Sequence, residues 1–396
     1  MKFPLSSDFQ DLAKFVPTFI ELCGVKAFKT RVRQLRQDIE ASPYLAKIVI
    51  DYHWMELCLS DLGDSFEVSE NGCLDDWCAV KFAAMCVEVY LRLTQQGKKE
   101  LSGRFRDALK SDAGFAPLYA EMDIALRFLA LDFDVGFEDL DGRASFDFLV
   151  SKGGEECEIE CKAFSVDAGR KVHRRDFYRL VHHITPDLLE NPPEHHEALI
   201  VTMRGRLIGN DCTRQEIAAA IRAQINSIDA SPDEWEHFDV VTTKLSGIVV
   251  DQDLHAELKN RFGHDMHAAG AITEEAGRLI IVRSDTEDDP SKPVLQHLRS
   301  AAEQLSKTRA GFIALQFNDI ELSDKPPENL LRRTAIISNA LFYHYNANHV
   351  AGVMIGTYRN AVGEGHDISA PVGTMVLNSG KVADLGPNIR SIIHLG

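Results

Sequence analysis

Two adjacent glycines, Gly153 and Gly154, separate two runs of alternating apolar and polar residues and constrain this chain more than any other feature. Glycine adopts the positive φ angles that a two-residue hairpin turn requires. Strand-like alternation precedes the pair from Ala144 to Ser151 and follows it from Glu156 to Phe164. The segment therefore predicts a β-hairpin with its turn at the two glycines.

Each strand of this hairpin is predicted to carry charged side chains on one face. On the first strand, Asp147 points away from the more apolar side, because successive side chains of a strand alternate between its faces. On the second strand, the apolar row is Cys157, Ile159, Cys161 and Ala163, and the opposite row is Glu156, Glu158, Glu160 and Lys162. One face of the second strand is therefore charged.

The turn also fixes which residues face each other. It places Asp147 directly opposite Glu160, with Cβ atoms about 4.5–5.5 Å apart, and Ser145 opposite Lys162. Facing like charges destabilise a sheet by a few tenths to about 1 kcal/mol, so a bound cation is expected to offset them. Mg²⁺ is commonly held by one or two carboxylates together with waters and phosphate oxygens. With Lys162 beside the carboxylates, the pattern predicts a Mg²⁺ or Mn²⁺ site that acts on phosphodiesters.

Asp147 followed by Glu160-Cys161-Lys162 resembles the motif of the PD-(D/E)XK nuclease superfamily, over about residues 117–203. The family core is a helix, a three-stranded meander, a helix and a further strand. The resemblance therefore implies a restriction-endonuclease-like α/β fold with a mixed α+β sheet. It implies that Asp147 and Glu160 bind the metal, that the Cys161 carbonyl is a further ligand, and that Lys162 assists the attacking water.

The resemblance departs from the motif at one position and extends to one more residue. The position before Asp147 is Phe146, where the name of the motif has proline, although that proline varies within the superfamily. Many members carry a glutamate on the helix before the meander, and Glu121 is similar, which implies a catalytic role for it. Glu121 also borders the apolar stripe of its predicted helix, so an ordinary boundary charge is an equal alternative.

The charged row of the hairpin has a simpler interpretation as well. Alternating charged residues usually form the solvated face of a strand at the edge of a sheet. Glu158 faces the same way as Glu160 but lies farther from the predicted cation, so it is expected on the surface.

A basic segment follows the hairpin, from Arg170 to Arg179. A helix over Val172–Ile184 would bury its apolar residues and leave basic side chains on a more polar side. The predicted nucleic-acid-binding residues are Lys171, Arg174, Arg175 and Arg179. The family often places basic residues on the helix after the motif strand, which supports this role. The alternative is a set of surface arginines paired with nearby carboxylates.

Net charge limits how such a protein can hold a polyanion. The chain has 43 Lys and Arg against 60 Asp and Glu, a formal net charge of −17. A molecule of this charge does not retain nucleic acid through its bulk field. Substrate contact is therefore expected in one local groove, or through a partner protein or a second copy of the chain.

Apolar spacing divides the chain into two predicted parts. Residues 1–115 have helical spacing and are predicted to form an all-helical N-terminal domain. Residues 116–396 are predicted to form the nuclease-like α/β domain with a C-terminal extension. Its helices are predicted at Pro117–Leu131, Val172–Ile184, Thr213–Ser227 and Val294–Lys307, and its further strands at Phe133–Phe137, Ala198–Met203, Gly247–Asp251, Leu279–Val282, Gly311–Phe317 and Val350–Thr357. The strands after Met203 either extend the sheet of the hairpin or form another layer.

Several features predict a cytoplasmic protein with no membrane partner. Residues Met1–Phe15 lack the apolar core of a signal peptide, and no apolar window is long enough to span a bilayer. The eight cysteines form no Cys-x-x-Cys pair, so neither a disulfide framework nor a zinc ribbon is indicated.

The sequence thus predicts a Mg²⁺- or Mn²⁺-dependent endonuclease that hydrolyses phosphodiester bonds. DNA is favoured over RNA by base rates within the family it resembles, and a bacterial defence or mobile-element setting follows by analogy alone. One alternative is a catalytically inactive nuclease-fold scaffold that binds protein or nucleic acid. Another is that the region after Met203 carries the function.

Overall fold

The protein is described by a computed structural model. The structure describes residues 8–64, 74–165, 167–207, 211–226, 236–245, 254–263, 265–318, 328–357 and 373–395. The predicted strand at Gly247–Asp251 lies outside these residues. Among the residues that are described, no helix is both long and apolar enough to cross a membrane.

The chain divides into two compact units. Unit 1 consists of Met1–Asp38, Val49–Val166 and Ser291–Gly396, and unit 2 of Ile39–Ile48 and Asp167–Pro290. This division differs from the predicted boundary between residues 115 and 116, which falls inside unit 1. The reason is a shared core: one hydrophobic cluster joins Phe19 and Phe82 of the N-terminal helices to Phe148 and Phe312 of the sheet.

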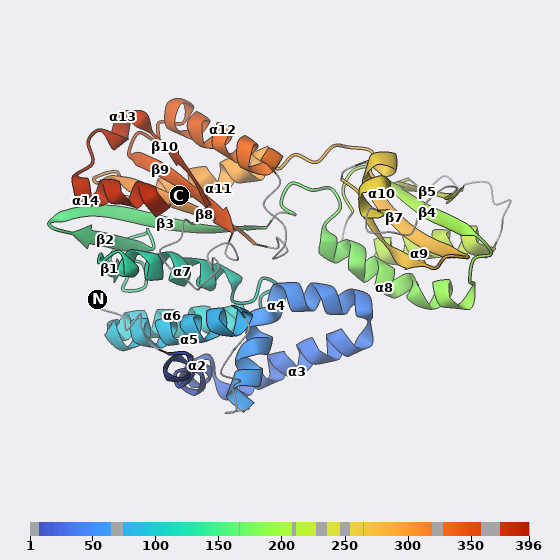
Figure 1. Ribbon diagram of the computed structural model, residues 1–396, viewed down its shortest axis with the longest axis horizontal. Coiled ribbons are helices and arrows are strands. Elements are labelled where there is room, and N and C mark those ends of the chain that lie inside the picture. Colours follow the sequence, from blue (N-terminus) through green and yellow to red (C-terminus); the bar gives the residue numbers. More distant parts are fainter. Residues whose placement is uncertain are drawn as a thin grey trace. The chain divides into compact units, whose positions relative to one another are not determined.

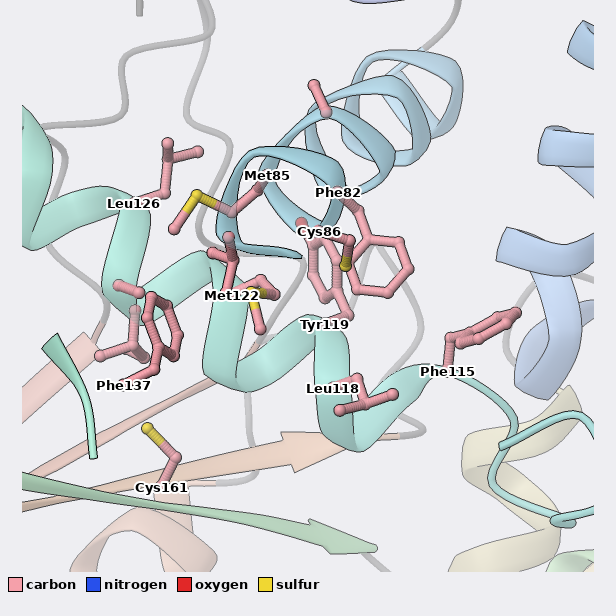
Figure 2. Packing of buried hydrophobic residues seen from close by; sticks show 14 of the residues in the cluster. Phe82, Met85, Cys86, Phe115, Leu118, Tyr119, Met122, Leu126, Phe137 and Cys161 are labelled. Atoms are coloured by element: carbon pink, nitrogen blue, oxygen red, sulfur yellow. The ribbon is translucent and has the colours of Figure 1, made fainter. Parts of the chain in front are cut away.

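The elements that the structure describes before the sheet are all helices. They are α1 (Phe9–Ala13), α2 (Val16–Cys23), α3 (Val25–Ala41), α4 (Pro43–Asp64), α5 (Leu74–Arg92), α6 (Gln95–Ala108) and α7 (Ala116–Ala130). Pro117 stands in the first turn of α7, where its missing N–H leaves no hydrogen bond unmade. Figure 2 shows Phe82 and Met85 of α5 on one side of α7 and Cys161 on the other. Helix α7 is therefore buried between α5 and the sheet.

A six-stranded mixed sheet forms the centre of unit 1, in the order β1-β2-β3-β8-β9-β10. Its strands are β1 (Asp134–Phe137), β2 (Phe148–Lys152), β3 (Glu155–Ser165), β8 (Gly311–Asn318), β9 (Val350–Thr357) and β10 (Gly373–Leu377). Strands β1, β2 and β3 form an antiparallel meander, β3, β8 and β9 run parallel, and β10 is antiparallel to β9. The sheet is mixed, so the α+β class is confirmed.

Helices cover both faces of this sheet. Figure 1 shows α7 on one face and α11 (Ser291–Gln304) and α12 (Glu328–His344) on the other. The alternation along β3 agrees: Cys161 belongs to the core that contains α7, whereas the ring of Phe164 contacts His297 of α11. The chain ends in α13 (Ser379–Val382), α14 (Pro387–Arg390) and a short 3₁₀ helix, η1 (Ser391–Leu395).

Unit 2 has its own four-stranded sheet, in the order β5-β4-β7-β6. Its elements are α8 (Arg174–Glu190), β4 (His196–Met203), α9 (Asp211–Asn226), β5 (Phe238–Lys244), α10 (Leu254–Phe262), β6 (His267–Ile272) and β7 (Gly277–Ser284). One apolar cluster packs α8 and α9 against the sheet and a second one packs α10 against it. Strands β5, β6 and β10 were not predicted; β6 reads His-Ala-Ala-Gly-Ala-Ile, which has little β propensity.

The pairing of the strands limits the part of the chain that the resemblance can cover. Ala198–Met203, a predicted strand at the end of the span that the resemblance covers, lies in β4 and pairs with β5 and β7 of unit 2. Strand β8 is the parallel neighbour of β3 instead, and α11 packs against both. Both alternatives for the strands after Met203 therefore occur. Strands β8, β9 and β10 extend the sheet of the hairpin, and β5, β6 and β7 belong to a second sheet.

Candidate functional site

The hairpin forms with the predicted turn and register. Gly153 and Gly154 have φ angles of 61° and 84°. The pairs run from Lys152 and Glu155 to Phe148 and Ile159, so the predicted register is confirmed along β2. The strand is shorter than predicted and begins at Phe148. The preceding residues fold into a turn in which Arg143 N–H donates to the carbonyl of Glu138 at 2.8 Å.

Asp147 and Glu160 meet just before β2 begins, one position beyond the outermost backbone pair, Phe148 and Ile159. The backbone N–H of Asp147 donates to Glu160 Oε2 at 3.2 Å, and the N–H of Cys161 donates to Asp147 Oδ2 at 2.6 Å. Both residues are buried, with 8% and 1% of their surfaces exposed. The two carboxylates that the register placed opposite each other are therefore held together by side-chain bonds to the backbone.

Lys162 completes a chain of polar contacts on the α11 side of the sheet. Its Nζ lies 2.5 Å from Glu160 Oε1 and 2.5 Å from Gln304 Oε1. Gln304 Nε2 donates to the Ser145 carbonyl at 3.2 Å, and Ser145 Oγ donates to the Gln304 carbonyl at 2.6 Å. Ser145 and Lys162, predicted to face each other, are thus linked through Gln304, which sequence reasoning missed.

A second basic side chain, Arg104 of α6, binds two acids of the same cluster. Its Nη1 donates to Glu121 Oε2 at 3.4 Å and its Nη2 donates to Asp139 Oδ2 at 2.5 Å. Glu121 lies on α7, as predicted, and faces this cluster. Asp139 lies in the turn after β1 and also accepts the Leu140 N–H at 2.6 Å. No pattern singled out Arg104 or Asp139, because each looks like one charge among the many of a helix or an acidic loop.

Burial raises the pKa of all four carboxyl groups in the cluster. It raises the pKa of Glu121 to about 7, against the attraction of Arg104. Burial is also the largest cause of the well-raised pKa of Asp147, and the charges of Glu121 and Glu160 add to it. The pKa values of Glu160 and Asp139 are raised by burial although Lys162 and Arg104 oppose the shift. The site therefore stabilises fewer negative charges than it has carboxyl groups.

The donor set suits a hard cation, although a complete set of ligands is not assembled. Within the described residues, no group of three or more His, Cys, Asp or Glu side chains is arranged to hold a metal ion. Two carboxylate oxygens, Asp147 Oδ1 and Glu121 Oε1, accept no hydrogen bond from the residues that the structure describes. Carboxylate oxygens are the ligands that Mg²⁺ prefers.

The Cys161 side chain does not belong to this polar cluster. Its thiol lies in the apolar core beneath α7 (Figure 2), and burial raises the pKa of that thiol well above its ordinary value. The prediction concerned the backbone carbonyl of Cys161 as a metal ligand, and that stays a prediction.

Two expectations about the charged row are wrong. Strand β3 is not at an edge, because it pairs with β2 on one side and β8 on the other. Glu158 is not on the surface: it is fully buried and accepts the N–H of Ser306 at 2.7 Å and an Nη1–H of Arg309 at 3.5 Å. The physical reason is that the segment between α11 and β8 covers this part of β3.

The predicted nucleic-acid-binding residues lie in unit 2, at the start of α8 and just before it. They are Lys171, Arg174, Arg175 and Arg179, and all are partly exposed. Carboxylates fix the backbone of this segment: Asp288 Oδ1 accepts the Lys171 N–H at 2.6 Å and Asp167 Oδ2 accepts the Arg174 N–H at 2.9 Å. Helix α11 packs against the motif strand β3, whereas these four residues belong to unit 2, and their role in binding nucleic acid stays a prediction.

The elements around the cluster follow one order along unit 1: helix α7, the meander β1-β2-β3, helix α11 and the parallel strand β8. The six polar residues Arg104, Glu121, Asp139, Asp147, Glu160 and Lys162 form what we call the carboxylate cluster. Comparisons of the chain with models of protein families, with curated proteins and with solved structures find no match.

Proposed function

We propose that the chain is a divalent-cation-dependent nuclease of the PD-(D/E)XK type that hydrolyses phosphodiester bonds. The observation that carries this proposal is the charge balance of the carboxylate cluster. Four carboxyl groups face two basic side chains, so full ionisation leaves two negative charges without a partner inside a largely buried site.

Such an excess must be neutralised by protons or by a cation. The raised pKa values, about 7 for Glu121 and well above the ordinary value for Asp147, correspond to the first solution, in which protons neutralise part of the excess. A carboxyl pKa that is higher by one corresponds to about 1.4 kcal/mol of preference for the neutral form. A divalent cation supplies the missing two charges and lets all four groups ionise. Asp147 Oδ1 and Glu121 Oε1, which accept no hydrogen bond from the described residues, would then turn toward it.

The order of elements also supports a restriction-endonuclease-like core. The family core runs helix, three-stranded meander, helix and further strand, and α7, β1-β2-β3, α11 and β8 follow that order. In this chain the core would be interrupted by the Asp167–Pro290 part of unit 2, which lies between β3 and α11 in the sequence. Asp147 then stands immediately before β2, and Glu160 and Lys162 stand on β3, inside the sheet, as in the proposed family.

The roles follow from the contacts. A bound Mg²⁺ or Mn²⁺ would polarise the phosphate and lower the pKa of a bound water. Asp147 and Glu160 would hold the ion, and Glu121 would hold it or orient water. Lys162, released from Glu160 when that carboxylate turns to the cation, would bind a phosphate oxygen and offset developing negative charge. Gln304 would keep the ammonium in place.

The substrate is proposed to be DNA, contacted in one restricted area. A net charge of −17 opposes unspecific coating of a polyanion. Lys171, Arg174, Arg175 and Arg179 of unit 2 remain candidates for phosphate contacts, or recognition comes from a partner protein or a second copy of the chain. A bacterial defence or mobile-element setting is an analogy from the proposed family.

Cleavage assays test the proposal directly. Linear, circular and single-stranded DNA and a matched RNA are incubated with the full chain in Mg²⁺, in Mn²⁺ and with chelator. Cleavage in metal alone is expected for the wild type, and linearisation of circular DNA identifies an endonuclease. Asp147→Asn, Glu160→Gln and Lys162→Ala should lose activity, whereas Glu156→Gln, an exposed acid of the same strand, should retain it. Equal activity in all variants would remove the proposed site.

One observation favours a second candidate, a nuclease-fold scaffold without catalysis. In this structure Lys162 binds Glu160 and Gln304, and no set of three metal-ligating side chains is assembled among the described residues. A scaffold would bind nucleic acid or protein without cleaving any substrate in either metal. It would also bind equally well after Asp147→Asn and Glu160→Gln.

A further inference from the structure

Helix α11 brings a second polar side chain to the site, seven residues before Gln304. Seven residues are about two helical turns, so His297 and Gln304 lie on the same face of α11. Gln304 Oε1 lies 2.5 Å from Lys162 Nζ, which shows that this face of the helix looks toward β3. His297 therefore faces β3 as well.

The position of His297 along β3 is fixed by an aromatic contact. Its ring lies edge-on to Phe164, with ring centroids 5.3 Å apart and an interplanar angle of 88°. Phe164 follows Lys162 by two residues, so it lies on the same face of β3 and about 6.6 Å farther along. A row along β3 thus runs from Glu160 and Lys162 of the carboxylate cluster to the Phe164–His297 contact.

The imidazole of His297 lies near enough to the site to be affected by the charge of Lys162, but it makes no hydrogen bond to the described residues of the site. Burial lowers the pKa of His297 and the nearby charge of Lys162 lowers it further, which keeps the ring neutral at physiological pH. The residue is half-buried, and neither ring nitrogen has a hydrogen-bond partner among the residues that the structure describes.

Two other histidines with buried or half-buried rings do have a hydrogen-bond partner. His349 Nε2 lies 2.8 Å from the Ala302 carbonyl, and His267 Nε2 lies 3.0 Å from the Val172 carbonyl. The ring nitrogens of His297 have no such bond among the described residues. An imidazole with two uncommitted nitrogens, next to a lysine of the site, is therefore available to a ligand.

We propose that His297 binds the substrate by donating a hydrogen bond to a non-bridging phosphate oxygen next to the cleaved bond. The inference rests on the proposed nuclease function and names one of its substrate contacts. A neutral imidazole carries one N–H donor, and such side-chain contacts to phosphate fix the register of a nucleic acid strand. The row along β3 places this contact beyond Lys162, on the side opposite Glu160.

The test combines protein variants with substrates modified at single phosphates. His297→Ala, His297→Gln and the control His344→Ala, which removes an exposed histidine of α12, are compared with the wild type. Each substrate carries one methylphosphonate at a different position along the strand, including the positions that flank the cleaved bond, which replaces one non-bridging oxygen of that phosphate by a methyl group and removes its negative charge. KM and kcat are measured in Mg²⁺, and binding is measured by fluorescence anisotropy in Ca²⁺.

If His297 contacts one phosphate, the effects of replacing His297 and of modifying that phosphate should not multiply. His297→Ala should raise KM about tenfold and change kcat less than about twofold, and His297→Gln should recover part of the loss because its amide also donates. At one flanking position, the methylphosphonate should weaken wild-type binding about tenfold and should not weaken His297→Ala further. His344→Ala should match the wild type on every substrate.

The outcomes separate this inference from the function on which it rests. If the wild type cleaves, and at every position the loss caused by His297→Ala multiplies the loss caused by the methylphosphonate, the His297 contact is overturned and the nuclease proposal stands. Coupled effects on binding without any cleavage would support the contact and overturn the nuclease proposal. Neither cleavage nor binding would overturn both.

Discussion

The ammonium of Lys162 lies 2.5 Å from the side-chain oxygen of Gln304, although the two residues are 142 positions apart. Unit 2 occupies most of the chain between them. The same glutamine also bonds to the backbone of Ser145, just before the hairpin. A single side chain of α11 therefore joins the lysine of the site to the turn that carries Asp147.

Replacement of Gln304 should reduce turnover rather than substrate binding. In Gln304→Leu the Lys162 ammonium keeps Glu160 but loses its second acceptor, so it is no longer held for a reacting phosphate. Loss of such an outer partner costs about 10–100-fold in activity at comparable sites. Steady-state kinetics should show a lower kcat with little change in KM. An unchanged kcat, with the thermal midpoint also unchanged, would exclude this positioning role.

The stability of the metal-free chain should fall as pH rises from about 4.5 to about 7. Glu121 has a pKa of about 7 in the folded chain against an ordinary value of 4.5, so the folded state binds more protons in that window. The free energy of unfolding then decreases with pH, by about 1–3 kcal/mol from this residue. Denaturant titrations with chelator at pH 5, 6, 7 and 8 measure it.

Glu121→Gln is the variant that isolates this effect. Its amide does not ionise, so its stability relative to the wild type should be greater at pH 8 than at pH 5. Asp107→Asn, which changes an exposed acid of the neighbouring helix α6, should keep the wild-type pH dependence. An identical pH dependence in Glu121→Gln would show that Glu121 is not the group that titrates.

Mg²⁺ should stabilise the chain and release protons as it binds. Binding favours the ionised carboxylates, so protons held by the raised pKa groups are displaced. At a free concentration of 100 times Kd, the gain is about 2.7 kcal/mol. Calorimetric titration in two buffers of different protonation enthalpy measures the release. Asp147→Asn should lose both the release and the rise in melting temperature; an unaltered rise would place the ion elsewhere.

Two neighbouring acids of β3 should differ sharply in their effect on stability. Glu158 is fully buried and accepts bonds from Ser306 and Arg309, whereas Glu156 is exposed and pairs only with Arg309 in the described residues. Glu158→Ala should lower the free energy of unfolding by about 2–3 kcal/mol, and Glu156→Ala by less than about 0.5 kcal/mol. Urea titrations compare them. Similar losses would mean that the burial of Glu158 contributes little.

The hairpin was predictable because its information is local. Two glycines set the turn, the turn sets the register, and the alternation sets the faces, so the Asp147–Glu160 pair follows from a short segment. Helix α7 was predictable for the same reason, since one apolar stripe and an initial proline specify it. These elements need no knowledge of the rest of the chain.

The remaining parts of the site depend on contacts that no local pattern records. Arg104, Asp139 and Gln304 reach the cluster from three separate segments, and each resembles an ordinary surface residue in sequence. The pairing of strands could not be predicted for a similar reason. Ala198–Met203 is an apolar run that suits either sheet, and only long-range packing assigns it to unit 2. The burial of Glu158 follows from a segment almost 150 positions later, Ser306.

The interruption of unit 1 by unit 2 sets the order in which the ribosome can complete the site. When β3 leaves the exit tunnel, Asp147, Glu160 and Lys162 have been made, but β8 and Gln304 have not. All of unit 2 is synthesised before α11 and β8 can close the sheet beside the motif strand, and this late closure joins segments far apart in the chain. A nascent chain therefore cannot form the Lys162–Gln304 contact or the pairing of β3 with β8 until translation has passed β8.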